Sequence, residues 1–244
     1  MKRNIIHDGV SIKIFETDDP QKVIIHFTDE ITAFNKIKKA VIKDKGVYCN
    51  GISCEISRLL QKGGVPTHFI EQISDTEQLC WKSQVIPMEV IVRNVIAGSM
   101  AQRLGLEEGI IPKEPVYDLC YKSDILCDPI INDYHAVALG LVSKEELERI
   151  YSLTKQVNSI LTPVFKEIGI TLVDFKIEFG HLSDGRLVMS DDITPDSARF
   201  WDIATGDRLD KDRFRKDNGH VGEAYMTVYE RLTGKSRTRL LKYA

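Results

Sequence analysis

The sequence lacks a hydrophobic run long enough to cross a membrane. A spanning helix needs roughly 20 apolar residues, whereas the longest apolar stretches here are only as long as a single strand. The N-terminus, MKRNIIHDGVS, is basic but contains no apolar segment of the kind found in signal peptides. The sequence therefore predicts a soluble, cytoplasmic protein that does not have a membrane as a partner.

Cysteine and histidine are few, and their spacing does not suit a disulfide framework or a zinc site. The chain has five cysteines, an odd number, and no C-x-x-C pair. Its six histidines include no H-x-x-x-H spacing. Reduced thiols in a cytosol fit this pattern better than secretion does. A large positive charge is absent as well, since the net charge is -3, and this argues against nucleic acid as the main partner.

The chain is long and apolar enough for a substantial core. Its 244 residues correspond to one large domain or two small ones, and 43% are hydrophobic. Alternation and helical spacing predict a helix at 51–62 and strands at 10–16, 23–28, 67–73, 77–82 and 88–94. The charged segment 28–46 is predicted to be a mobile loop with room for a short helix. The stretch 84–87 is the expected boundary between a strand-rich front half and a larger mixed back half.

The back half contains the clearest helix signal. Ser143 and Glu146 form a capping-box pattern, and apolar residues then recur at helical spacing up to Ile168. Pro163 lies inside this pattern and is expected to kink the helix or end it early. A weaker helix is predicted at 219–233, and the basic tail 235–244 is predicted to be a solvated end.

The segment 172–180, LVDFKIEFG, alternates strictly between apolar and polar residues. This places Asp174, Lys176 and Glu178 on one face of a strand. An edge strand with a wet face would give the same alternation. However, the next predicted strand, 186–189, leads directly into Asp191, so several carboxylates and one lysine would meet at neighbouring strand ends. Crowded carboxylates need a cation, and Mg²⁺ with nucleotide phosphates is a common one. The spacing favours an enzyme that uses a magnesium nucleotide.

Other polar residues have both a functional and a structural interpretation. Arg93 shares a strand face with Glu89, as a structural ion pair would, and Ser99 follows Gly98 where a helix start could bind an anion or be capped. The remaining candidates lie in polar segments that could be simple connectors or surface turns, namely Lys122, Asp128, Asp196, Ser197 and Arg199.

Several long segments resemble the SAICAR synthase (phosphoribosylaminoimidazole-succinocarboxamide synthase) family. They follow the family's order and span most of the chain: FTDEITAFN at 27–35, PMEVIVRNVIAGSMAQRLGLEEG at 87–109, LVDFKIEFG at 172–180, SDDITPDSARFWD at 190–202 and LDKDRFR at 209–215. The resemblance implies an α+β fold, with a small kinase-like antiparallel β lobe at 1–85 packed on a larger mixed α/β lobe at 86–244.

The resemblance also implies a reaction. The family is an ATP-dependent ligase of purine biosynthesis, which joins 5-amino-1-(5-phospho-D-ribosyl)imidazole-4-carboxylate (carboxyaminoimidazole ribotide) to L-aspartate and releases ADP and phosphate. ATP is needed because a carboxylate is a poor electrophile until an acyl phosphate gives it a leaving group. The expected partners are thus ATP, the ribotide and L-aspartate, with Mg²⁺ as cofactor and a homo-oligomer as the assembly.

Carried over residue by residue, the resemblance assigns a role to each candidate. Glu178 and Asp191 would hold Mg²⁺ and the nucleotide. Lys176, near the phosphates, would act in catalysis with Lys122 and Asp128. Arg93, Ser99, Arg199 and, as a weaker candidate, Lys211 would bind the ribotide. The remaining ATP contacts would come from Gly9 and Lys13 and from backbone atoms of Gln84, Val85 and Ile86, which would bind adenine as a hinge does, with Lys82 close by.

One segment departs from the family pattern. The first hairpin of the family usually reads G-K-A-K-K-I-Y, whereas this chain has GVSIKIF at 9–15. Val10 and Ile12 therefore replace two lysines, and only Lys13 remains. Weaker ATP binding is the expected consequence, because each charge-assisted contact contributes roughly 1.5–3 kcal/mol.

Two alternatives remain open. A small-molecule kinase could use the same acidic pair to phosphorylate a hydroxyl, but it would have no use for Arg93, Ser99 and Arg199 together. A nucleotide-binding protein without catalytic activity would explain the lost lysines, and it would be stabilised by ATP without turning it over. Whether ADP release depends on both L-aspartate and the ribotide distinguishes the ligase from these two alternatives.

Overall fold

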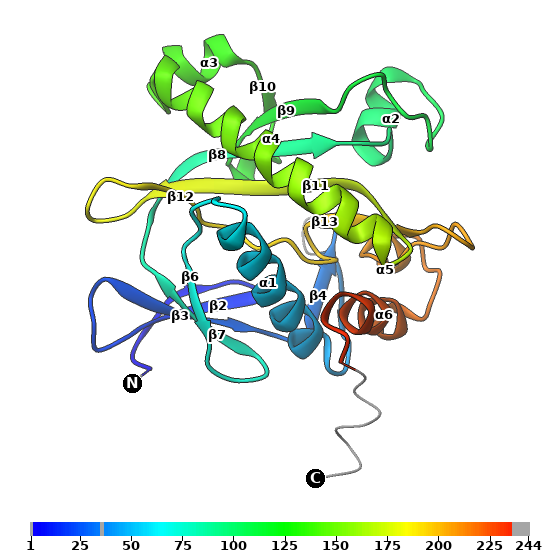
Figure 1. The fold of residues 1–244 in the computed structure, drawn as a ribbon, viewed down its shortest axis with the longest axis horizontal. Helices are drawn as coiled ribbons and strands as arrows, with labels where there is room; N and C mark the ends of the chain where they lie inside the picture. Colours follow the sequence, from blue (N-terminus) through cyan, green and yellow to red (C-terminus); the bar gives the residue numbers. More distant parts are fainter. Residues whose placement is uncertain (1, 35–36, 236–244) are drawn as a thin grey trace.

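The computed structural model describes residues 2–34 and 37–235, and two antiparallel sheets organise them (Figure 1). The first sheet has the order β1-β2-β3-β7-β6, and the second has the order β10-β9-β8-β11-β12, with β13 also pairing with β11. The first sheet consists of β1 (Ile5–Asp8), β2 (Ile12–Glu16), β3 (Lys22–Phe27), β6 (Phe69–Gln72) and β7 (Glu77–Trp81).

The second sheet takes all its strands from the part of the chain after Trp81. They are β8 (Gln84–Arg93), β9 (Val116–Tyr121), β10 (Ile130–Ile131), β11 (Ile170–His181), β12 (Leu187–Met189) and β13 (Ala198–Asp202). The α-helices are α1 (Lys45–Lys62), α2 (Gly98–Leu104), α3 (Asp133–Ala138), α4 (Lys144–Glu167), α5 (Asp212–Arg215) and α6 (Val221–Thr233), with a 3-10 turn at Asp124–Leu126. The predicted α+β fold is confirmed. No helix among the described residues is both long and apolar enough to cross a membrane.

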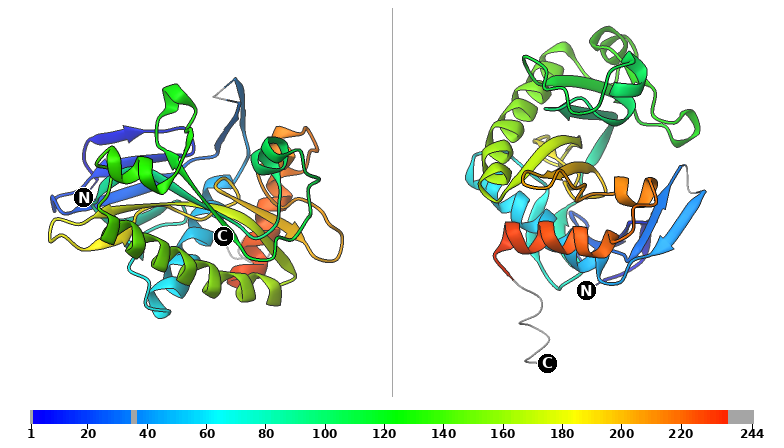
Figure 2. Two further views of the ribbon diagram at one scale, coloured as in Figure 1. Left: turned by 90° about the horizontal axis from the view of Figure 1, so that it is seen from above. Right: turned by 90° about the vertical axis from the view of Figure 1, so that its right-hand side faces the viewer.

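The long strand β11 lies at the centre of the second sheet, between β8 and both β12 and β13. Its apolar side chains Phe175, Ile177 and Phe179 are almost completely buried in the main core, and α4 packs against the strand (Figures 1 and 2). The alternate residues Asp174, Lys176 and Glu178 leave the opposite face polar. The strand thereby contributes to both the core and the polar site.

The segment 28–46 is ordered where the structure describes it, so the prediction of a mobile loop is wrong there. It forms the hairpin β4 (Glu30–Ala33) and β5 (Lys38–Val41), and α1 begins at Lys45, six residues before the predicted helix start. Ile31 is completely buried, and so is Lys45, because its Nζ pairs with Asp196 Oδ2 at 2.7 Å. A partner about 150 residues away in sequence could not be inferred from local charge.

Helix α4 continues through Pro163, so the expected early end does not occur. Pro163 lies on an exposed part of the helix, where water can satisfy the carbonyl that its missing N–H leaves free. At the start of α4, Ser143 Oγ accepts a hydrogen bond from the Glu146 N–H at 3.1 Å. The Glu146 side chain contacts His181 instead of completing a capping box. The weaker helix predicted near the C-terminus is confirmed as α6, and the tail 236–244 lies outside the described residues.

Helix α6 packs closely against α1, although the two are far apart in sequence (Figure 1). The ring of Tyr229 lies directly over Gly51, where a Cβ atom would collide with it. Tyr229 also contacts the ring of Tyr48, with 5.7 Å between centroids, and Tyr225 donates a hydrogen bond to Asp196 Oδ1 at 2.8 Å. The last described helix therefore belongs to the packing around the first one.

Candidate active site

A groove consists of three adjoining cavities that share wall residues, two of them between the two sheets and the third along the second sheet. The apolar cavity, of about 150 Å³, shares Ile12, Val85 and Asp191 with a central cavity of about 430 Å³. The central cavity shares Lys176 and Asp196 with the arginine cavity, of about 190 Å³. The groove is therefore continuous from an apolar end, through an acidic centre, to a cationic end.

The apolar cavity is formed by branched side chains of the first sheet. Ile14, Val23 and Ile25 project into it from β2 and β3, while Val85 closes it from the first residues of β8. Its polar wall residues include His68, Lys82, Ser190 and Asp191. A cavity of this composition suits a flat, largely apolar ring with a few polar edges.

Lys176 lies among three carboxylates in the centre of the groove. Its Nζ is 2.6 Å from Glu89, 3.4 Å from Glu178 and 3.9 Å from Asp191. Pairing of β11 with β8 places Glu178 directly opposite Glu89. Burial lowers the pKa of Lys176, but the carboxylates of Asp191, Glu178 and Glu89 outweigh this effect and raise it above its ordinary value. The lysine is therefore a permanent cation at neutral pH.

Asp191 and Glu178 have the properties that a magnesium nucleotide site requires. Asp191 Oδ2 is buried and has no hydrogen-bond partner among the described residues, and burial followed by the nearby Glu178 raises the pKa of Asp191 well above its ordinary value. Glu178 contacts Lys122 at 2.5 Å as well as Lys176. Among the described residues, no three His, Cys, Asp or Glu side chains are arranged so that they could hold a metal ion together. However, Mg²⁺ at nucleotide sites usually takes one or two carboxylates and completes its shell with phosphates and water, so this pair fits.

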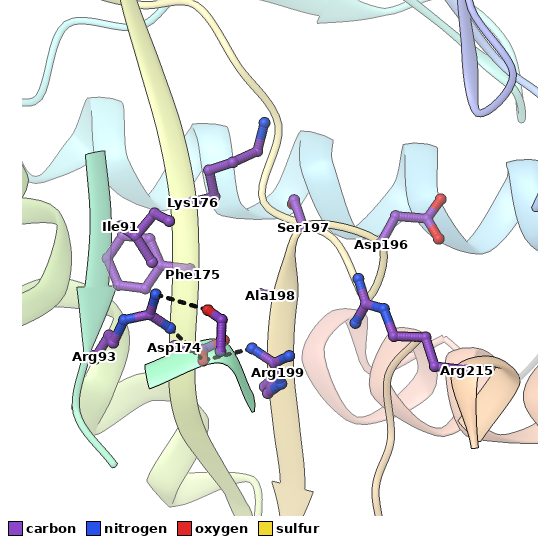
Figure 3. A pocket seen from close by; sticks show the side chains of 11 residues that line it. Ile91, Arg93, Asp174, Phe175, Lys176, Asp196, Ser197, Ala198, Arg199 and Arg215 are labelled. Carbon is purple, nitrogen blue, oxygen red and sulfur yellow. Dashed lines mark hydrogen bonds and ion pairs between the residues drawn. The ribbon is translucent and has the colours of Figure 1, made fainter. Parts of the chain in front are cut away.

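Two arginines converge at the other end of the groove (Figure 3). Arg93 is 2% exposed, and its Nε donates to Asp118 Oδ2 at 2.8 Å. Arg199 donates to Asp174 at 2.8 Å and to Asp212 at 2.8 Å, and these carboxylates outweigh burial to raise its pKa above the ordinary value. The two guanidinium groups share Asp174, from which Arg93 lies at 3.6 Å. Rigidly held guanidinium groups are well suited to binding phosphate.

Gly98 allows Arg199 to approach the start of α2. It has a φ of 54°, and a Cβ atom at this position would collide with the Arg199 guanidinium group. The neighbouring Ser99 lines the same cavity, and its Oγ accepts from Arg93 at 3.3 Å.

We expect Gly98→Ala to lower the free energy of unfolding by about 1–2 kcal/mol, because the left-handed conformation is costly for alanine. It should also weaken anion binding at the arginine cavity, because the collision displaces Arg199. Gly105→Ala is a matched control, since Gly105 has a φ of 64° and no atom of the described residues lies within 4 Å of the added Cβ. Thermal unfolding and phosphate binding of both variants test this expectation. Equal loss of phosphate binding in the two would contradict it.

The structure does not bring every predicted residue to the groove. Lys13 faces away from Ile12 and Ile14 and pairs with Asp8 at 2.9 Å, and Gly9 lies in the turn between β1 and β2. Asp128 accepts from the Ser123 N–H at 2.8 Å rather than lining a cavity.

The other predicted residues divide between the cavities. Of the stretch 84–86, Val85 lines the groove, while the Gln84 side chain is exposed and that of Ile86 is buried in the core, so the predicted contacts of this stretch through backbone atoms stay a prediction. Lys82 lines the apolar cavity, and Lys122 lines the central one. Lys211 lines the central cavity rather than the arginine cavity, and burial lowers its pKa.

Sequence reasoning missed residues that hold the site in place from other elements. Asp118 on β9 and Asp212 on α5 position the two arginines, and Arg215 lines the arginine cavity. Asp212 and Arg215 lie in the LDKDRFR segment, so that segment was a usable signal. No feature of the sequence pointed to Asp118.

A cation among carboxylates, between an apolar cavity and an arginine pair, is typical of enzymes that transfer a phosphoryl group from a nucleotide. The family model described as SAICAR synthetase matches residues 5–232. Phosphoribosylaminoimidazole-succinocarboxamide synthase of Clostridium acetobutylicum is 52% identical over 96% of this chain and 99% of its own length. The chain therefore belongs to the SAICAR synthetase family.

Solved structures show the same similarity. The crystal structure of phosphoribosylaminoimidazole-succinocarboxamide synthase from Ehrlichia chaffeensis has a TM-score of 0.92 at 42% identity, over 94% of this chain and 98% of that one. A SAICAR synthetase in complex with ADP also has a TM-score of 0.92, at 43% identity, over 96% and 99% of the two chains.

Proposed function

We propose that the chain condenses carboxyaminoimidazole ribotide with L-aspartate, converting ATP to ADP and phosphate in purine biosynthesis. The observation that supports this most directly is the continuous groove. Its apolar end suits an adenine ring, its acidic centre suits magnesium and phosphates, and its arginine end suits the phosphate of a ribotide. The similar SAICAR synthetase solved with ADP supports nucleotide binding by this fold.

In the proposed reaction, a carboxylate oxygen of the ribotide attacks the γ-phosphorus of ATP, and the bond to the bridging oxygen of ADP breaks. The aspartate amine then attacks the acyl phosphate carbon, phosphate leaves with the bonding electrons, and the nitrogen loses a proton. Glu178 and Asp191 would hold Mg²⁺, which would neutralise charge on the phosphates. Lys176 provides a fixed cation, and Arg93 with Arg199 holds the ribotide, so the protein contributes mainly positioning and electrostatic stabilisation.

The remaining predicted roles belong to the same proposal. Lys122, 2.5 Å from Glu178, lies beside the reacting phosphate, and Lys211 contributes positive charge to the central cavity. Val85 and Lys82 contact the adenine. Asp128 has a more distant role, because it fixes the loop that carries Lys122 through its bond to Ser123.

We expect ADP release to require Mg-ATP, the ribotide and L-aspartate together, with the succinocarboxamide as the product. A coupled assay that omits each component in turn measures this. ADP release without aspartate would favour a kinase. Binding of ATP without any release would favour a non-catalytic nucleotide-binding protein. The arginine cavity supports the ligase, because neither alternative needs a second phosphate site.

Restoring the missing charge in the first hairpin should strengthen ATP binding. Ile12 lines both the apolar and the central cavity, whereas Val10 lines neither. We therefore expect Val10→Lys with Ile12→Lys to lower the KM for ATP by about tenfold, and Ile12→Lys alone to account for most of it, since one charge-assisted contact is worth roughly 1.5–3 kcal/mol. Val10→Lys alone is the control. An unchanged KM in the double variant would show that other groups already neutralise the phosphates.

The lobes, the assembly and the location of the protein complete the proposal. The chain would form a small lobe at 1–85 and a larger lobe at 86–244, and the change from the first sheet to the second, between Trp81 and Gln84, lies close to this boundary. Exposed apolar side chains around α3, including Tyr134 and Leu139, offer a surface for a homo-oligomer. The five free cysteines agree with a cytoplasmic location.

A further inference from the structure

His68 lies in the wall of the apolar cavity, and its imidazole ring has no polar partner in the described part of the protein. The side chain is nearly buried, with 6% of the residue exposed. Its backbone is firmly held, because the His68 N–H donates to Met189 O at 2.9 Å and its carbonyl accepts from Trp81 N at 2.7 Å. The ring itself makes no hydrogen bond with any described residue, and it lines the cavity beside Ile14 and Val85.

A second unsatisfied polar group faces the same cavity. Ser190 Oγ is buried and has no hydrogen-bond partner among the described residues. His68 immediately precedes β6 of the first sheet, and Ser190 immediately follows β12 of the second. The two groups therefore reach the cavity from opposite sheets.

Packing alone does not explain these residues. The buried Ser190 Oγ, without a partner among the described residues, destabilises the folded protein, and an apolar side chain of similar size would be more favourable than either residue in a wall made largely of isoleucine and valine. The local packing would therefore favour leucine or alanine at these two positions. A bound molecule that supplies the missing hydrogen bonds removes the penalty, because both groups then gain partners.

The ring is uncharged, which limits what it can bind. Burial lowers the pKa of His68 to about 4, against a smaller opposing effect of Glu178. A neutral imidazole has one N–H donor and one nitrogen acceptor, and a hydroxyl can do both. Such a pair suits the mixed donor and acceptor edge of a heterocyclic base, whereas phosphates are better matched by the lysines of the central cavity.

We propose that His68 and Ser190 bind the base of the nucleotide through hydrogen bonds to its polar edge. This inference rests on the proposed use of ATP and assigns side chains from both sheets to recognition of the base. Nucleotide binding would then add side-chain contacts to the backbone hydrogen bonds that already link the two sheets at Met189.

The first experiment measures Mg-ATP binding to the full chain by calorimetry, without ribotide or aspartate, together with thermal unfolding of the nucleotide-free protein. We expect His68→Leu to raise the Kd for ATP by about tenfold, the effect of losing one well-formed hydrogen bond, without lowering the unfolding temperature. His68→Gln, which retains a donor and an acceptor, should recover part of the affinity. His26→Leu is the matched control, because His26 lies on β3 and lines none of the three cavities.

The second experiment identifies the contacted atoms with ATP analogues. The analogues are 7-deaza-ATP, purine riboside triphosphate, which lacks the 6-amino group, and 2′-deoxy-ATP. We expect the penalty of His68→Leu to disappear with one of the two base-modified analogues and to persist with 2′-deoxy-ATP. A purely structural role for His68 would reduce binding of all three equally.

Each remaining outcome is decisive. Unchanged ATP affinity in His68→Leu would overturn this inference and leave the proposed ligase intact. A penalty that is the same for every analogue, or that disappears only with 2′-deoxy-ATP, would overturn the assignment to the base. Failure of the wild-type chain to bind ATP would overturn both the inference and the proposed function.

Discussion

Asp191→Asn should lower kcat by about a thousandfold or more, which corresponds to roughly 4 kcal/mol of transition-state stabilisation from magnesium and its ligands. Asp191 combines a buried carboxylate oxygen that accepts no hydrogen bond from any described residue with a place in both the apolar and the central cavity. Asparagine keeps the shape but removes the charge that a magnesium nucleotide requires. Steady-state rates at saturating Mg-ATP, ribotide and aspartate measure the loss.

The same variant should be more stable than the wild type when magnesium and nucleotide are absent. Burial and Glu178 raise the pKa of Asp191, so the folded protein binds this proton more tightly than the unfolded chain does. Stability therefore falls as the pH rises from the ordinary aspartate value of about 4 through the folded pKa. Asp191→Asn removes that loss, so its gain should appear at neutral pH and vanish in acid.

Thermal unfolding across this pH range measures the gain in stability separately from the loss of activity. Asp184→Asn, in an exposed pair with Arg186, is the control and should leave both activity and stability almost unchanged. Near-normal turnover in Asp191→Asn would exclude Asp191 from the magnesium site.

Arg199→Met should lower the free energy of unfolding by about 3–5 kcal/mol, because it leaves a buried carboxylate without its main partner. Asp174 is 3% exposed and accepts from Arg199 at 2.8 Å, whereas Arg93 is 3.6 Å away. The same change removes half of the arginine pair, so the KM for the ribotide should rise steeply. Chemical denaturation and substrate titration measure the two effects separately.

A double variant distinguishes stability from binding. Arg199→Met combined with Asp174→Asn removes the unpaired charge, so it should recover much of the stability without recovering ribotide binding. Arg186→Met, which breaks the exposed pair with Asp184, should cost at most about 1 kcal/mol. If Arg199→Met were no more destabilising than Arg186→Met, the arginine network would not support the fold.

Sequence periodicity predicted the part of the site that one strand carries. Alternation in 172–180 placed Asp174, Lys176 and Glu178 on one face, and β11 has that arrangement because its other face packs into the core. The same rule applied to β2 would have turned Lys13 away from Ile12 and Ile14, as the structure shows. The family pattern led to Lys13 because it describes residue types rather than strand faces.

What the sequence did not predict depends on contacts between distant segments. Lys45 appeared to belong to a charged loop, yet it is completely buried because Asp196 and the surrounding packing enclose it. Asp118 supports Arg93 from a neighbouring strand whose pairing is set by the whole sheet. A single sequence contains the residues of such pairs but not their proximity, so local pattern could not recover them.

The packing of α6 on α1 has a consequence for synthesis on the ribosome. Tyr48 and Gly51 lie in the first quarter of this sequence, whereas their partner Tyr229 emerges from the exit tunnel long after them. Until then, one side of α1 has no covering partner, and Asp196 lacks its hydrogen bond from Tyr225. The front lobe therefore cannot complete its native packing before α6 has emerged, and a nascent chain stalled before residue 221 would expose this helix surface to chaperones and proteases.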